Sequence, residues 1–288
     1  MSPHDFKRRL VSGETLVAIG AHNGLSARLG EEAGFECLWA SGLEISASRG
    51  MPDANIITFS EMADAVRNIV ESVSIPVIVD ADSGYGNAIN VIRTVQELEH
   101  AGAAGLCLED NVFPKRNSFY ADVTRDIVDA REHVSKIKAA VYARKSEDFV
   151  VIARTEGFIV GLGVDEVLER AHAYADAGAD AVLVHSKIDN PSEIYAFSAR
   201  WDREVPLVAV PTTYNSVTVE ELRAHGYTMC IFANHGIRSF VSRAREILRQ
   251  LRESGSASTV EPQLCTLGDL FGLVGFADLK RREVEFLG

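Results

Sequence analysis

Residues 76–87 read PVIVDADSGYGN, and this stretch decides the fold class that the sequence predicts. Its first residues are apolar on consecutive positions, which is typical of a parallel strand buried on both faces. The strand then ends in Asp80 and Asp82, followed by a short loop with two glycines. A buried strand that ends in carboxylates indicates a polar site at its carboxyl end.

Seven other apolar runs of similar length recur along the chain, and each ends in polar residues. They are LVAIGAH (16–22), ECLWASG (36–42), GLCLED (105–110), FVVIART (149–155), AVLVHS (181–186), LVAVPT (207–212) and MCIFANH (229–235). Segments with helical spacing separate them, near residues 24–34, 60–73, 88–101, 128–145, 163–177, 217–225 and 238–253. The alternation predicts parallel βαβ units, and eight units favour a closed (β/α)8 barrel of the TIM type over an open doubly wound sheet.

A short repeat before several strands supports this interpretation. Ala33-Gly34, Ala101-Gly102 and Ala177-Gly178 each precede a predicted strand, and His225-Gly226 resembles them. Glycine directly after a helix can take a positive φ and turn the chain toward the next strand. We therefore expect these glycines to end helices.

The C-terminal part of the chain differs from the repeating units. Residues 254–259 (SGSAST) have the composition of a linker, and residues 266–287 are predicted to be helical with an apolar stretch. A closed barrel offers no obvious place to bury that stretch, so we expect a neighbouring subunit to cover it. The predicted organisation is a barrel domain over 1–253, with a linker and C-terminal helix over 254–288.

The composition restricts the classes of partner. The chain has 288 residues, with 41 acidic against 29 basic, and the net charge of -12 disfavours binding to nucleic acid. No apolar run approaches the roughly 18 residues of a membrane span, and the N-terminus lacks a secretory pattern. The four cysteines form no C-x-x-C pair, and we expect reduced, buried thiols in a cytoplasmic protein.

Three carboxylates end two of the predicted strands. Asp80, Asp82 and Glu109 would meet at one face of a barrel, because its site forms at the carboxyl ends of the strands. They would repel one another unless a cation lay between them, and oxygen ligands without a nearby cysteine indicate Mg²⁺ or Mn²⁺. The structural alternative is that strand-end aspartates cap the next loop or helix, but the set of three favours a metal.

The sequence allows two alternative roles for each of two strand-end side chains. Arg154 follows the apolar run FVVIA and needs an anionic partner, which is either Glu156 or an anionic substrate. His185 ends AVLVH and is either a core histidine or a site residue. We expect structural roles for His22 and His235.

Residues 112–118 (VFPKRNS) are predicted to form either a lid over the site or a solvated loop. Lys115, Asn117 and Ser118 supply hydrogen-bond donors there that suit a phosphoryl or carboxylate group.

These residues together resemble the phosphoenolpyruvate mutase/isocitrate lyase superfamily, over essentially the whole chain. The resemblance is carried by WASGL (39–43), PD (52–53), DADSGYGN (80–87), ED (109–110), KRNS (115–118), AR (153–154), HS (185–186) and ANH (233–235). The carbon–carbon lyases of the superfamily carry a Cys in the lid, and none stands here. Glu109-Asp110 followed by Asn117-Ser118 resembles the mutase signature, although Asn111 stands where that signature has Lys. Phosphonopyruvate hydrolase carries Thr at the position of Asn117.

The resemblance implies a role for each site residue. Asp80 would bind Mg²⁺ directly, and Asp53, Asp82 and Glu109 would hold the ion through its waters. The carboxylate end of the substrate would bind to Ser41, Gly42 and Leu43. The phosphoryl group would be cradled by Lys115, Asn117, Ser118, Arg154 and His185.

The resemblance also implies an activity. The chain would be an isomerase of phosphonate biosynthesis that interconverts phosphoenolpyruvate and phosphonopyruvate through a Mg-stabilised pyruvate enolate. The alternatives are hydrolysis of phosphonopyruvate to pyruvate and phosphate, and cleavage or decarboxylation of an oxaloacetate-like acid. A further alternative is a barrel that only senses a dicarboxylate. Members of the family usually form dimers or tetramers, so a homodimer or homotetramer is expected.

Overall fold

Eight parallel strands close into a barrel in the computed structural model, which describes residues 1–115 and 126–288. The strands are β1 (Leu16–Ala21), β2 (Cys37–Ala40), β3 (Val77–Asp80), β4 (Gly105–Glu109), β5 (Val150–Thr155), β6 (Ala181–Val184), β7 (Leu207–Ala209) and β8 (Tyr227–Phe232). They pair in chain order, and β8 returns to β1 with Phe232 opposite Ile19. The predicted (β/α)8 barrel is therefore confirmed.

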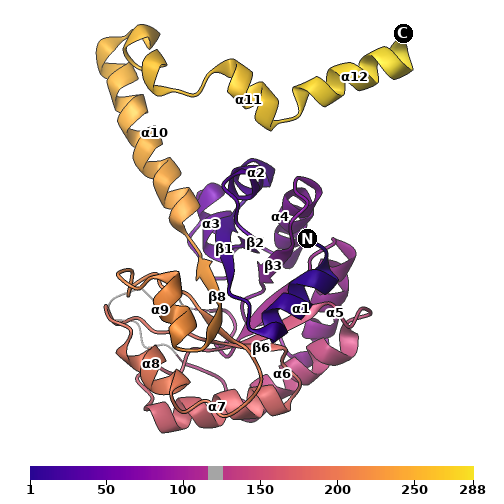
Figure 1. The fold of residues 1–288 in the computed structure, drawn as a ribbon, viewed down its shortest axis with the longest axis vertical. Helices are drawn as coiled ribbons and strands as arrows, with labels where there is room; N and C mark the ends of the chain where they lie inside the picture. Colours follow the sequence, from indigo (N-terminus) through magenta and orange to yellow (C-terminus); the bar gives the residue numbers. More distant parts are fainter. Residues whose placement is uncertain (116–125) are drawn as a thin grey trace. The chain divides into compact units, whose positions relative to one another are not determined.

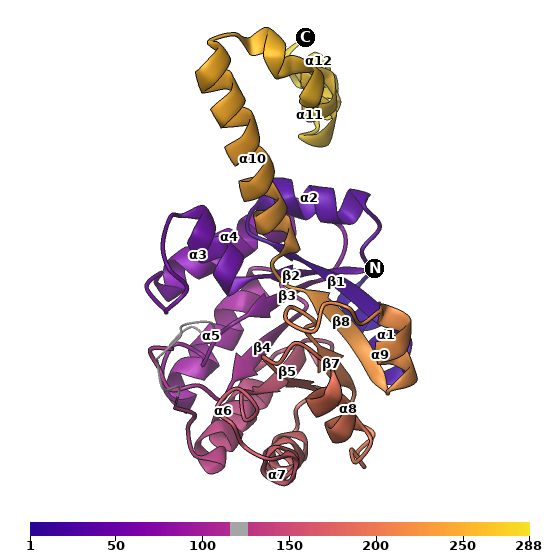
Figure 2. The ribbon, with the colours of Figure 1, turned by 90° about the vertical axis from the view of Figure 1, so that its left-hand side faces the viewer.

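Helices surround the strands, as Figures 1 and 2 show. Those of the barrel are α1 (Pro3–Ser12), α2 (Gly24–Glu32), α3 (Gly42–Ser48), α4 (Phe59–Glu71), α5 (Ala88–His100), α6 (Ala130–Ala143), α7 (Val164–Asp176), α8 (Ser192–Ser198) and α9 (Val219–Ala224). Each predicted helix is present, but α1, α3 and α8 were not predicted. The last two have seven residues each, which is too short to show a helical period.

The glycines predicted to turn the chain do so. Gly34, Gly102, Gly178 and Gly226 have φ values of 88, 88, 100 and 83°, in the left-handed region that a side chain disfavours. Each follows a helix and leads into a strand, so the repeat in the sequence corresponds to one turn repeated around the barrel.

The interior of the barrel is apolar up to the level of the site. Trp39, Ile78 and Ile152 belong to one buried cluster there, and Phe6 and Leu10 of α1 join it. Helix α1 thus contributes to the packed core. The polar side chains of the site lie at the carboxyl ends of the strands. Three of the four predicted thiols, Cys37, Cys107 and Cys230, are buried and free, whereas Cys265 is exposed.

The chain divides into two compact units, Met1–His235 and Gly236–Gly288. The second holds most of α10 (His235–Ser254), two short 3-10 turns, α11 (Leu267–Leu273) and α12 (Phe276–Leu287). The single helix predicted over 266–287 is therefore two helices, because Gly275 takes a φ of 77° between them. The predicted boundary after residue 253 stays a prediction. Among the helices of the described residues, none combines the length and the hydropathy that a membrane span requires.

Candidate active site

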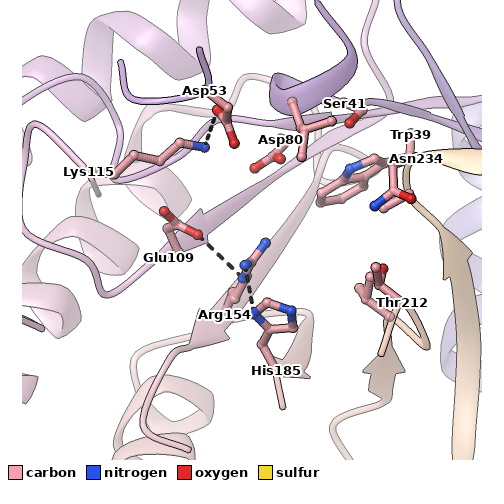
Figure 3. A pocket seen from close by; sticks show the side chains of 13 residues that line it. Trp39, Ser41, Asp53, Asp80, Glu109, Lys115, Arg154, His185, Thr212 and Asn234 are labelled. Atoms are coloured by element: carbon pink, nitrogen blue, oxygen red, sulfur yellow. Dashed lines mark hydrogen bonds and ion pairs between the residues drawn. The ribbon is translucent and has the colours of Figure 1, made fainter. Parts of the chain in front are cut away.

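A pocket opens at the carboxyl ends of the strands, where the sequence predicts the site (Figure 3). Its lining residues are Trp39, Ser41, Leu43, Asp53, Asp80, Glu109, Lys115, Arg154, His185, Val210, Thr212, Ala233 and Asn234. Most of the predicted site residues are among them, and Gly42 and Asp82 lie directly beside them. Asn117 and Ser118 lie outside the described residues.

Buried carboxylates form the acidic side of the pocket. Asp80 and Glu109 are the last residues of the neighbouring strands β3 and β4, and they are only 8% and 3% exposed. Asp82 follows with a φ of 49°, and its Oδ2 accepts a 2.6 Å hydrogen bond from the side-chain amide of Asn55. Burial raises the pKa of Asp80, and raises the pKa of Asp82 to about 8. Burial therefore disfavours the charged form of both carboxylates, and a cation bound among them would offset that cost.

Lys115 is the side-chain cation of this acidic side. Its ammonium lies 2.8 Å from Asp53 and also contacts Asp82, while its backbone N–H donates to Asn55 Oδ1 at 2.6 Å. Burial by itself lowers the pKa of Lys115, but the carboxylates, Asp82 first, raise it well above its usual value. The ammonium therefore stays charged.

The donor set fits a hard divalent cation. Among the described residues, no three acidic, His or Cys side chains are grouped closely enough to hold an ion as they stand. Instead, Lys115 pairs with two of the four predicted metal-site carboxylates. All four offer oxygen only, and oxygen ligands in an acidic pocket are those that Mg²⁺ and Mn²⁺ prefer.

Arg154 and His185 form the other side of the pocket, and both contact the buried Glu156. The Arg154 Nε lies 2.6 Å from Glu156 Oε1. It also lies 3.4 Å from Glu109 Oε2, and the Arg154 Nη2 lies 2.9 Å from His185 Nδ1 (Figure 3). His185 Nδ1 also lies 2.8 Å from Glu156. Arg154 therefore pairs with Glu156, as one alternative predicted, and it also lines the pocket, so that its contact with an anionic substrate stays a prediction. His185 is a pocket residue, 5% exposed.

The turn after β2 forms the third wall. The Ser41 Oγ accepts a 3.3 Å hydrogen bond from the backbone N–H of Glu44, so its hydroxyl hydrogen can point to a ligand. Gly42 lies close to the acidic side, since a side-chain carbon placed on it would be 3.4 Å from Asp80 Oδ2. This turn brings neutral donors beside the carboxylates.

Sequence reasoning missed several residues of the site. Asn55 orients Asp82, and the amide of Asn111 donates to Glu109 Oε1 at 2.6 Å. Glu156 was not missed, because the sequence offered it as a partner of Arg154, and the two side chains do pair. Thr212 and Asn234 also line the pocket, and their places at strand ends were a usable signal. Asn55 gave no such signal in the sequence, because it reaches the site from a loop far away along the chain.

The fold and the pocket are those of a TIM-barrel protein whose strand ends carry a polar pocket, with buried carboxylates on one side and Arg154 and His185 on the other. The chain belongs to the phosphoenolpyruvate phosphomutase family, whose model matches residues 6–252. It is 41% identical over 98% of its length to the phosphoenolpyruvate phosphomutase of Tetrahymena pyriformis, of which it covers 94%.

Two solved structures are also very similar. The phosphoenolpyruvate phosphomutase from Streptomyces platensis subsp. rosaceus is 39% identical with a TM-score of 0.97, and each chain is covered completely. A phosphonopyruvate hydrolase in complex with oxalate and Mg²⁺ is 41% identical with a TM-score of 0.95, again over the whole of both chains. The resemblance to the superfamily is confirmed. The sequence identities to the mutase and to the hydrolase are nearly equal, so they do not decide between the two activities.

Proposed function

We propose that this protein is a phosphoenolpyruvate mutase, an isomerase that interconverts phosphoenolpyruvate and phosphonopyruvate in phosphonate biosynthesis. The observation that carries the proposal is the division of the pocket into an acidic side and an Arg154–His185 side, joined by the turn at Ser41. Such a pocket matches a substrate with a carboxylate at one end and a phosphoryl group at the other.

The acidic side would hold Mg²⁺, with Mn²⁺ as a substitute. Asp80 would bind the ion directly, and Asp53, Asp82 and Glu109 would hold it through water. When bound, the ion would supply positive charge to the carboxylate and enolate oxygens of the substrate. The charge of the pocket supports this, because four carboxylates meet there with Lys115 and Arg154 as side-chain cations.

The chain's own residues would position the substrate. The Ser41 hydroxyl and the backbone N–H groups of Gly42 and Leu43 would bind its carboxylate. Arg154, His185 and Lys115, together with Asn117 and Ser118, would hold the phosphoryl group while its bond to C3 breaks and a bond to the enolate oxygen forms. Phosphoryl transfer depends mainly on such positioning and charge stabilisation.

The lid sequence favours the mutase over the hydrolase. Asn117 matches the mutase signature, whereas the hydrolase carries Thr there, and a closed site that excludes water would prevent hydrolysis. Phosphonopyruvate hydrolase remains the second candidate, because a relative of that name is as similar in sequence as the mutases.

A coupled assay tests the proposal. Phosphonopyruvate and Mg²⁺ are added to the protein with lactate dehydrogenase and NADH, with or without pyruvate kinase and ADP. A mutase forms phosphoenolpyruvate, so NADH is consumed only when pyruvate kinase and ADP are present. Consumption without pyruvate kinase identifies the hydrolase, and no consumption in either arm excludes both activities.

We also propose a homodimer or homotetramer in the cytoplasm, formed through the C-terminal helices. Phe271 of α11, and Val284 and Phe286 of α12, are 45%, 75% and 74% exposed, which supports a covering subunit. Light scattering on the eluting peak of a size-exclusion column gives the mass directly. A mass equal to that of one chain would contradict the proposal.

A further inference from the structure

The side chains of His22 and Glu44 are in contact beside the pocket, and neither residue lines it. The ring Nδ1 of His22 lies 2.8 Å from Glu44 Oε2, and the Glu44 side chain is fully buried. His22 directly follows β1, and Glu44 lies in α3, two residues after Gly42. The pair therefore connects the end of one strand to the turn that forms the third wall of the site.

Stability alone does not explain Glu44. Burying a carboxylate costs free energy unless all of its hydrogen bonds are made, and Glu44 Oε1 makes none with the described residues. It faces Gly20, where a side-chain carbon would lie 2.6 Å from Oε1 and 2.3 Å from the carbonyl oxygen of Ala233. An apolar side chain would fill this place at lower cost.

The contacts of the pair lead into the pocket. The backbone N–H of Glu44 donates to Ser41 Oγ, and both Ser41 and Ala233 line the pocket. On the other side, the backbone N–H of His22 donates to Ser26 Oγ at 3.0 Å, in the first turn of α2. A continuous set of contacts thus runs from α2 through His22 and Glu44 to Ser41.

We propose that the His22–Glu44 pair positions the turn Ser41-Gly42-Leu43, so that its hydroxyl and N–H groups meet the carboxylate end of the substrate. The identity of that substrate rests on the proposed function. The pair does not line the pocket, so His22 and Glu44 are positioning residues.

Oxalate binding tests this role without any turnover, because oxalate has the shape and charge of the carboxylate end of pyruvate enolate. Titration calorimetry with oxalate and saturating Mg²⁺ would compare Glu44→Leu, Glu44→Gln and His22→Gln with the unmodified protein. We expect oxalate to bind about tenfold more weakly in all three, a change of roughly 1.4 kcal/mol. The melting temperature of Glu44→Leu should not fall, since a buried ion pair is often replaced without loss of stability.

A matched control is the pair His172–Asp202, at 2.9 Å on the outside of the barrel. His172→Gln should leave oxalate affinity unchanged. If Glu44→Leu does not fold, Glu44→Gln keeps the volume of the side chain and carries the same comparison. A role in stability alone would lower the melting temperature and leave the affinity of the folded protein unchanged.

Ser41→Ala completes a double-mutant cycle. If Glu44 acts through Ser41, the double variant Ser41→Ala/Glu44→Leu should bind oxalate little worse than Ser41→Ala alone. The proposal would be overturned if the losses of oxalate affinity in the two single variants multiplied in the double variant. It would also be overturned if Glu44→Leu bound oxalate with unchanged affinity, or if the unmodified protein bound no oxalate. Coupled oxalate binding without conversion of phosphonopyruvate would instead refute the proposed function and leave the positioning role standing.

Discussion

The ammonium of Lys115 lies 2.8 Å from the carboxylate of Asp53 and also contacts Asp82. Both carboxylates belong to the set proposed to hold Mg²⁺. The lysine and the ion would therefore neutralise the same negative charges and repel each other. Lys115 would accordingly lower the affinity of the proposed site for the ion, in addition to its proposed contact with the phosphoryl group.

Lys115→Met should separate these two effects. Removal of the buried cation is expected to tighten Mn²⁺ binding by roughly tenfold, because a repulsive charge at short range disappears. Activity should fall by at least about 100-fold, since a phosphoryl ligand is lost. Electron paramagnetic resonance of free Mn²⁺ measures the affinity, with Lys138→Met of the exposed face of α6 as the control. Weaker Mn²⁺ binding would show that Lys115 instead holds the carboxylates in place.

Asp80→Asn keeps the volume of the side chain and removes its charge. The variant is expected to lose activity by about 1000-fold or more, and Mg²⁺ should no longer raise its melting temperature. Without Mg²⁺ it should melt higher than the unmodified protein, because one buried carboxylate of a repelling set is gone. Thermal denaturation with and without Mg²⁺ measures this, with the exposed Asp64→Asn as the control. Retained activity in Asp80→Asn would rule out the proposed metal position.

Glu156→Gln should loosen Arg154 and His185 without changing the metal site. Glu156 Oε1 lies 2.6 Å from the Arg154 Nε and 2.8 Å from His185 Nδ1, so it orients both. We expect kcat/KM for phosphonopyruvate to fall by about 100-fold, while Mn²⁺ affinity stays within a factor of about two. The exposed Glu169→Gln on α7 is the control. An equal loss of metal affinity would mean that Glu156 supports the acidic side as well.

The stability of the protein should depend on pH through His133, which is fully buried in α6. Burial lowers the pKa of His133 to about 3, from the usual 6.5. Below pH 6.5 His133 binds a proton in the unfolded chain but stays neutral in the folded protein. The contribution of His133 to the free energy of unfolding is therefore lost as pH falls toward 3. Asp110 acts in the opposite sense, because burial raises its pKa to about 6 and the folded protein takes up that proton first.

His133→Phe removes the pH-dependent contribution of His133 to stability and leaves that of Asp110. The slope of the unfolding free energy between pH 6 and 4 should change by about 1.4 kcal/mol per pH unit, with less stability lost on acidification. Urea denaturation at several pH values measures it. Parallel pH profiles for the two proteins would show that His133 becomes protonated in the folded state.

The barrel was predictable because its signal repeats. Eight apolar runs, each ending in polar residues, and the turn glycines Gly34, Gly102 and Gly178 all indicate the same topology. The acidic residues Asp80, Asp82 and Glu109 were predictable for a related reason, since strand ends meet at one face of a barrel. The lid residues Asn117 and Ser118 stay predictions.

Other parts of the site were not predictable from spacing. Asn55 reaches Asp82 from a loop, and Glu44 meets His22 through a short helix, so neither contact follows a periodic pattern. The split of the C-terminal helix depends on a single residue, Gly275. Such contacts depend on the path of loops in three dimensions, for which the sequence contains no repeating signal.

The central claim is that phosphorus moves within one substrate molecule and never to water. Phosphorus NMR of phosphonopyruvate incubated with the protein and Mg²⁺ in ¹⁸O-labelled water tests it most directly. The proposed mutase should convert the phosphonate signal into that of phosphoenolpyruvate, with no ¹⁸O on the non-bridging phosphoryl oxygens and no inorganic phosphate. Inorganic phosphate carrying one ¹⁸O, formed without phosphoenolpyruvate, would contradict the claim and identify a hydrolase.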